Sequence, residues 1–244
     1  MRSRALSLLA LSLLTAGCAN GADSSLLAGF LLGLPDEAIG GGNNAELTVF
    51  LARGASPLEV AANTIEDADL VFGASEGRVV ALPHISDGFY IRTSIEDPAL
   101  RYVHGASWEV GADVDSQRVE VRIETPAAAG LFGSPLDGSW SAGRELVLTL
   151  GAEGADRAFA WVNGPTGEVT WTDEPPNTGA LLQWLATEPG VSSVVIPGVA
   201  FPVAGTYRVV VVATSDADPD RFRGVSNLSR FSMGLATELS LDVQ

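Results

Sequence analysis

From residue 46 onward the chain alternates short, partly apolar runs with turns rich in Gly, Pro, Asp and Asn. In residues 118–123 (RVEVRI) three branched apolar side chains alternate with three charged ones, and this period of two is typical of a strand with one buried face. No apolar run of helical period exceeds about three turns after residue 18, so we expect an all-β protein. Comparable runs predict further strands at 47–51, 68–72, 78–82, 88–91, 107–110, 145–150, 157–162, 168–172, 181–186, 192–196, 207–214 and 235–243.

Short strands at this spacing favour β-sandwiches. A stretch rich in Pro, Ala and Gly at 125–135 (TPAAAGLFGSP) interrupts the series and indicates a boundary. We therefore predict two sandwich domains, residues 46–126 and 127–244, with no repeat between them at the residue level.

The region before residue 46 has a different pattern. Residues 40–44 (GGGNN) have the composition of a flexible linker. The apolar run 26–34 (LLAGFLLGL) predicts either a short helix near a membrane surface or a segment that packs on the following domain. We expect residues 18–45 as a whole to act as a tether.

The first 18 residues, MRSRALSLLALSLLTAGC, have the layout of a secretory signal peptide, with two arginines, an apolar stretch and small residues before Cys18. The apolar stretch is shorter than the roughly 20 residues that span a bilayer. Cys18 is the only cysteine of the chain, so a disulfide within one chain is excluded.

The segment that ends at Cys18 resembles a bacterial lipobox, although Thr15 stands where that family usually has Leu. The resemblance implies a signal peptide of residues 1–17 that is cleaved, and a Cys18 thiol and amino end that carry acyl chains such as palmitate. Ala19 and Asn20 follow the cysteine. The absence there of the Asp that retains lipoproteins in the inner membrane implies the cell outer membrane, with a periplasmic or surface-facing body.

Two segments resemble immunoglobulin-like and transthyretin-like (carboxypeptidase-regulatory-like) modules of bacterial envelope proteins. Residues 197–211 (PGVAFPVAGTYRVVV) are similar to the entry into a late strand of an immunoglobulin-like domain. The resemblance implies a tyrosine corner at Tyr207 and a buried Trp at Trp161. In the first half, 88–90 (GFY) and 100–108 (LRYVHGASW) carry the transthyretin-like resemblance. Such sandwiches have many unrelated roles, so the resemblance implies a fold and not an activity.

The charge of the chain excludes one class of partner. Its 14 basic residues are all Arg, and they face 30 acidic residues for a net charge of −16. Cleavage after residue 17 removes Arg2 and Arg4 and no acid, which leaves 12 basic residues and a charge of −18. Such a body repels phosphate backbones, so we expect no nucleic-acid partner.

Candidate catalytic groups are few. Residues 73–77 (GASEG) fit the G-x-S-x-G pattern around Ser75, but a strand-like segment follows where a nucleophile elbow needs a helix. A hairpin turn explains the match. The two histidines, His84 and His104, show no spacing that supports a triad or a metal site. We expect a protein that is not an enzyme, and a lipoprotein hydrolase is the alternative with least support.

Residues 216–220 (DADPD) alternate carboxylates on a loop, as calcium sites do. Asp216, Asp218 and Asp220 are weak candidate calcium ligands, with help from Asp67 or Asp69 if the fold brings them near. Arg221 stands where the EF-hand has Gly, so an EF-hand is not supported. Asp113 and Asp115 form a second alternation, which we expect at a hairpin tip. A solvated acidic loop is the main interpretation, and no other cofactor is expected.

Trp140, Trp171 and Trp184 could stack on sugar rings, but core packing is the more common role of Trp. The sequence as a whole predicts a lipid-anchored cell-envelope protein with a binding or structural role. Its partners would be the membrane, through the lipid on Cys18, and an envelope protein or a surface ligand. Calcium-dependent surface adhesion is the alternative.

Overall fold

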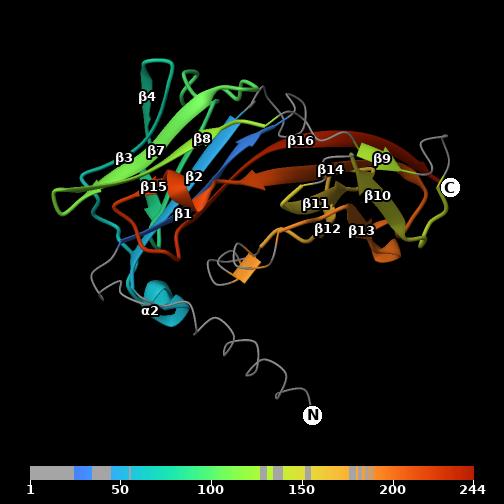
Figure 1. Cartoon of the computed structure of the whole chain (residues 1–244). Helices are drawn as coiled ribbons and strands as arrows, with labels where there is room; N and C mark the ends of the chain where they lie inside the picture. Colours follow the sequence, from blue (N-terminus) through green and yellow to red (C-terminus); the bar gives the residue numbers. More distant parts are fainter. Residues whose placement is uncertain are drawn as a thin grey trace, which may run out of the picture.

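We describe a computed structural model of the chain, which is built almost entirely of β-strands (Figure 1). This confirms the predicted all-β fold. The described residues are 25–34, 45–54, 56–126, 131–133, 140–151, 155–175, 180, 183–184, 187 and 189–244.

The strands of this described part form three sheets. The eight-stranded sheet has the order β12 (Val169–Thr172), β11 (Arg157–Asn163), β14 (Gly205–Asp216), β16 (Arg230–Val243), β1 (Ser25–Gly33), β2 (Ala45–Arg53), β6 (Phe89–Thr93) and β5 (His84–Ser86). The five-stranded sheet has the order β15 (Phe222–Arg223), β8 (Gln117–Glu124), β7 (Ser107–Val114), β3 (Leu70–Ser75) and β4 (Arg78–Ala81). The three-stranded sheet has the order β13 (Ser193–Ile196), β10 (Leu146–Leu150) and β9 (Leu131–Gly133). The described residues also include the short helical segments α2 (Pro57–Ala62), η2 (Gly198–Ala200) and η3 (Pro219–Arg221).

The two smaller sheets pack against the same face of the eight-stranded sheet. On β16, Phe231 and Met233 enter the core under the five-stranded sheet, whereas Leu241 and Val243 enter the core under the three-stranded sheet. These positions lie an even number of residues apart, so their side chains share one face of the strand. We call the two packed units the first and the second sandwich. β14 and β16 run from one to the other and join them into one sheet (Figure 1).

β1 is a central strand, which corrects the expected tether over 18–45 for residues 25–33. It pairs antiparallel with β2 over its whole length and parallel with β16 from Ala28 to Gly33. Leu26 and Leu27, which point to opposite faces of the sheet, are 1% and 0% exposed. A strand buried on both faces has a continuous apolar sequence, and this explains the run LLAGFLLGL. Of the two alternatives for 26–34, packing on the body is the one observed.

The first sandwich takes strands from both ends of the chain. β1 and the first half of β16 contribute to its core, and β15 pairs with β8. These strands lie outside the predicted first domain, 46–126. The division into two domains at residues 126/127 stays a prediction.

Several local expectations are confirmed. The Tyr207 hydroxyl donates to the Val203 carbonyl at 2.9 Å, as a tyrosine corner does. Ser75 pairs with Arg78 across a two-residue turn, so GASEG is a hairpin. Asp115, with φ of 50°, occupies the tip between β7 and β8.

Other local expectations are wrong. Trp161 is only half-buried and lies against a cluster on the opposite face of the sheet from the second core. Trp140, at 3% exposure, is the tryptophan inside that core. The predicted strand 181–186 contains helical residues at Gln183 and Trp184.

Candidate functional site on the outer face of the long sheet

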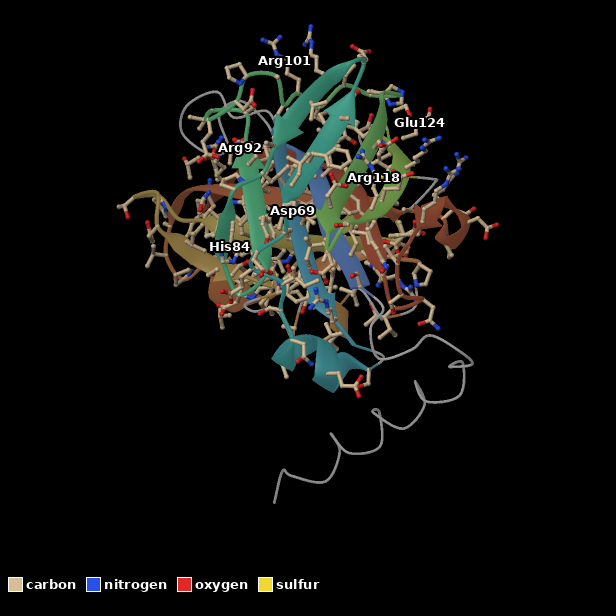
Figure 2. All side chains as sticks on the ribbon, turned by 90° about the vertical axis from the view of Figure 1, so that its left-hand side faces the viewer. Asp69, His84, Arg92, Arg101, Arg118 and Glu124 are labelled. Atoms are coloured by element: carbon tan, nitrogen blue, oxygen red, sulfur yellow. The ribbon has the colours of Figure 1, made fainter. Side chains whose placement is uncertain are left out.

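The catalytic candidates are not brought together in the described part of the chain. The Ser75 hydroxyl donates to the Ser107 carbonyl at 2.9 Å. His84 lies exposed on edge strand β5, with its ring 5.2 Å from that of Tyr90 (Figure 2). His104 lies exposed in a turn before β7. None of the contacts seen among the described residues joins Ser75 to either histidine, so this arrangement offers the serine no base.

The acidic run 216–220 is divided between different contacts. The Asp216 carboxylate accepts hydrogen bonds from Arg157 and from the Ser232 hydroxyl, at 2.7 Å for the latter. The Asp218 carboxylate accepts the backbone N–H of Asp220 at 2.9 Å and caps η3. Among the described residues no three His, Cys, Asp or Glu side chains form a metal-binding group. Asp216 therefore already forms an ion pair with Arg157, and the side chains of Asp218 and Asp220 are exposed.

The lipidation candidate Cys18 and the predicted signal peptide lie outside the described residues. In the described part of the chain, no helix has the length and apolar character needed to cross a bilayer.

The exposed face of the five-stranded sheet carries a network of charges around Arg118 (Figure 2). Its guanidinium lies 3.1 Å from Glu109 and 3.2 Å from Glu120, and it stacks 4.3 Å above the centre of the Phe72 ring. Arg122 lies 3.3 Å from the same Glu109. Because these charges satisfy one another at the surface, they stabilise the sheet only weakly and leave little for a ligand.

The face of the eight-stranded sheet that points away from both sandwich cores carries a second apolar layer. We call it the outer face. Alternate residues of β1, β2, β11, β14 and β16 point there, which follows from the period of two in a strand. Its buried members are Leu26, Ala28, Leu32, Leu34, Phe50, Ala52, Val60, Phe159, Val210, Val212 and Ala236.

Three aromatic side chains lie together on this face. The Phe159 ring is 6.3 Å from that of Trp161 and 5.8 Å from that of Trp184, the latter in an edge-to-face arrangement. Trp184 packs against both apolar clusters of the outer face. Trp161 and Trp184 are half-buried, so packing uses a large part of each ring.

Arg157 fixes the segment around Trp184 to the sheet. Its side chain is 4% exposed. One amino group, Nη1, donates to the carbonyls of Trp184 at 2.6 Å and Thr187 at 2.8 Å. The other, Nη2, donates to Asp216 at 2.9 Å. The buried guanidinium therefore holds the backbone at Trp184 and Thr187 in place and also neutralises the charge of Asp216.

Three carboxyl groups lie near the same apolar layer. Withdrawal from water raises the pKa of half-buried Glu46, and repulsion from Glu174 adds to this, while a hydrogen bond from Thr48 opposes it. Partial desolvation also raises the pKa of Asp173 and of Glu174, although both side chains reach solvent. Asp173 is committed in part, because it accepts the Ala160 N–H at 2.6 Å. Each of the three carboxyl groups therefore holds its proton to a higher pH than an exposed carboxyl group of its kind. Among the described residues they do not form a metal-binding group.

Of the tryptophans considered as a sugar platform, only Trp184 lies among these aromatic rings. Trp140 is in the second core, and its indole N–H donates to the Arg144 carbonyl at 3.0 Å. Trp171 packs on the edge of the same core. Sequence reasoning missed Arg157, Glu46 and Phe159. A single Arg, Glu or Phe in a strand does not show which face of the sheet it occupies when both faces carry apolar side chains.

Comparison with known proteins adds the following. No family model matches the sequence, and no curated protein matches it. Among solved structures, fibronectin(III)-like modules of Clostridium thermocellum CbhA align with 90% of this chain and 94% of theirs, at 11% identity and a TM-score of 0.24. Salmonella alpha-2-macroglobulin reacted with methylamine aligns with 93% of this chain and 15% of its own, at 13% identity and a TM-score of 0.26. The chicken CNTN1 FN1-FN3 domains align with 81% of this chain and 62% of their own, at 13% identity and a TM-score of 0.18. Similarity at this level carries no argument about function.

Proposed function

We propose that the chain is a lipid-anchored protein of the bacterial cell envelope, held by acyl chains on Cys18, whose β-sandwich body has a non-catalytic binding or structural role. One observation carries the proposal. The only cysteine follows directly on a positively charged end, a short apolar run and two small residues, which is the layout of a signal peptide, and its segment resembles a lipobox apart from Thr15. Two or three acyl chains, at about 0.8 kcal/mol per buried methylene, make a firm anchor.

The body supports the second half of the proposal. Its described residues give Ser75 no histidine partner, and its most buried ion pair holds a segment of the fold in place. General acid–base and nucleophilic catalysis both need a base within hydrogen-bond reach of the reacting group. A strand-built body whose most buried charges pair with each other suits recognition or spacing better than chemistry.

Metabolic labelling tests the anchor. The full-length chain, with an epitope tag after Gln244, would be expressed in a diderm bacterium fed with an alkyne analogue of palmitate. We expect the label on the chain and the chain in the outer-membrane fraction. The Cys18→Ser variant should lose both properties, whereas the matched control Ser24→Ala should keep both. A Cys18→Ser chain that still carries the label would refute the anchor.

Protease accessibility then decides the orientation. Proteinase K would be added to intact cells and to cells with a permeabilised outer membrane. Digestion on intact cells means that the body faces outward, toward surface ligands or neighbouring cells. Protection until permeabilisation means that it faces the periplasm, as part of an envelope complex.

A further inference from the structure

The point at which the chain joins its body is fixed. The Ser25 carbonyl accepts the N–H of Ser226 at 2.8 Å, and the N–H of Leu27 donates to the Ser229 hydroxyl at 3.1 Å. The next side chains are buried on both faces of a sheet, with strands on either side. Pulling residues out from Ser25 onward would break a central strand, so any free chain between Cys18 and the body ends at Ser25.

The stretch of sequence from Cys18 to Ser25 is short compared with the body. Seven Cα steps separate Cys18 from Ser25, which is at most about 25 Å of extended chain. Part of that length must cross the headgroup layer, which is about 5–7 Å thick on each side of the bilayer. β16 alone has 14 residues, about 45 Å of strand. The membrane must therefore lie close to the part of the body that surrounds Ser25.

The structure defines that part. Ser25 pairs with Arg53 at the end of β2, and α2 begins four residues further on, after Ser56. Arg53 forms an ion pair with Asp115 at the tip of the β7–β8 hairpin. We name the surface made by residues 53–54, 56–63, 114–117 and 226–229 the α2 end.

The second sandwich lies at the opposite end. β16 passes the first sandwich and ends at Val243, beside Gly205 at the start of β14. Figure 1 shows α2 and the C-terminus at opposite ends of the molecule. The turn 163–167 belongs to the same remote end, because Asn163 pairs with Arg208 near the start of β14.

We propose that the α2 end is the surface that rests on the bilayer and that the second sandwich projects away from it. This inference rests on the proposed lipid anchor at Cys18. The bilayer that holds the acyl chains is the partner of this surface. The charge of −18 after cleavage disfavours a body lying flat on anionic headgroups, since contact would bring many acidic side chains within a Debye length of about 8 Å.

The single cysteine makes the test direct. When Cys18 carries lipid, an introduced cysteine is the only free thiol in the chain. Asn227→Cys and Glu59→Cys place it on the α2 end, Thr166→Cys on the remote end, and Val79→Cys on edge strand β4. All four native side chains are exposed, so each variant should fold, and circular dichroism would verify this. The full-length chains, processed in bacteria, would be labelled with a fluorescent maleimide and reconstituted into phosphatidylcholine/phosphatidylglycerol vesicles that contain a headgroup-nitroxide lipid.

We expect the nitroxide to quench most of the fluorescence at Asn227→Cys and Glu59→Cys and little of it at Thr166→Cys and Val79→Cys. Equal quenching at Thr166→Cys and Asn227→Cys, with the protein floating with the vesicles, would overturn the orientation while the anchor stands. Protein that fails to float with the vesicles would overturn the anchor itself, and the orientation with it. Strong quenching at Val79→Cys would mean a body lying on its side and would also overturn the proposal.

Discussion

Arg157 and Asp216 form an ion pair on the outer face of the long sheet, with Nη2 and Oδ2 2.9 Å apart and side chains that are 4% and 20% exposed. The Arg157 Nε lies 3.1 Å from the same carboxylate oxygen, so two donors on one edge of the guanidinium hold the carboxylate. The pair joins β11 to the end of β14, and Nη1 extends the contact to the backbone at Trp184 and Thr187. The Arg157 side chain thus connects β11, β14 and the backbone at Trp184 and Thr187.

Removal of Arg157 should be strongly destabilising. In Arg157→Leu the partly buried Asp216 carboxylate loses the guanidinium and keeps the hydrogen bond from the Ser232 hydroxyl. The backbone carbonyls of Trp184 and Thr187 each lose a donor. Breaking a buried pair from one side costs about 3–5 kcal/mol. We expect the free energy of unfolding to fall by about 3 kcal/mol in urea denaturation.

Arg122→Leu is the matched control. Arg122 is 52% exposed in its side chain and pairs with Glu109 on the surface. Exposed pairs contribute about 0–1 kcal/mol, so this variant should unfold close to the wild-type midpoint. Equal losses in the two variants would show that Arg157 does not have the role that its contacts indicate.

The same ion pair predicts how the protein responds to calcium. Asp216 would have to release Arg157 before it could bind a cation, and Asp218 and Asp220 alone offer too few oxygens for calcium, which takes six to eight. We expect the thermal midpoint of the full-length protein in detergent to be the same in millimolar calcium and in chelator. A ligand of the folded state raises that midpoint. An increase with calcium that Asp218→Asn abolishes would restore the calcium-dependent alternative.

The sequence was informative where one face of a strand is exposed. Residues 118–123 alternate clearly, and they lie in β8 of the five-stranded sheet. β1 has no such alternation, because both of its faces are covered, and a short apolar run without a period fits a buried helix segment equally well. Its parallel partner β16 lies 202 residues away along the chain, counted from Ala28 to Arg230. No local pattern encodes that pairing.

The candidate site was harder to predict than the fold. Asp216 attracted attention because carboxylates alternate around it, but its partner Arg157 is 59 residues away and carries no motif. Trp161 was placed in a core by resemblance, yet its strand has one apolar layer on each side. With both faces apolar, the sequence does not show which face a large side chain occupies.

The position of β1 in the first core makes a further prediction. Leu31 is 0% exposed in that core, although it lies within the region expected to be a tether. Leu→Ala substitutions in cores cost about 2–5 kcal/mol, so Leu31→Ala should lower the free energy of unfolding by that amount. Val79→Ala is the control, since Val79 is 63% exposed and the change should stay within about 0.5 kcal/mol. A Leu31→Ala chain as stable as the control would mean that β1 is not part of the folded body.

The raised pKa of Glu46 predicts a pH dependence with a definite sign. A group whose pKa is raised by folding stabilises the protein in its protonated form. This contribution is complete below the unfolded pKa, near the ordinary value of 4.5, and is lost as pH rises through the raised folded pKa. At pH 7 the charged Glu46 therefore destabilises the fold. Glu46→Gln keeps an oxygen for the Thr48 hydroxyl and removes the charge, so it should be more stable than wild type at pH 7, and this advantage should shrink as pH falls toward 4.5.

Glu168→Gln supplies a control of opposite sign. The Thr166 hydroxyl donates to Glu168 and lowers its pKa, so this carboxylate stabilises the fold above its ordinary value of 4.5 and loses that contribution as pH falls through the lowered pKa. Glu168→Gln should be the less stable chain at pH 7 and should approach wild type at low pH. Urea midpoints of the three proteins between pH 2 and 8 would measure both trends. A Glu46→Gln chain that is less stable than wild type at pH 7 would mean that Glu46 has a stabilising charged partner, and desolvation of its carboxylate would then not be the dominant effect at this position.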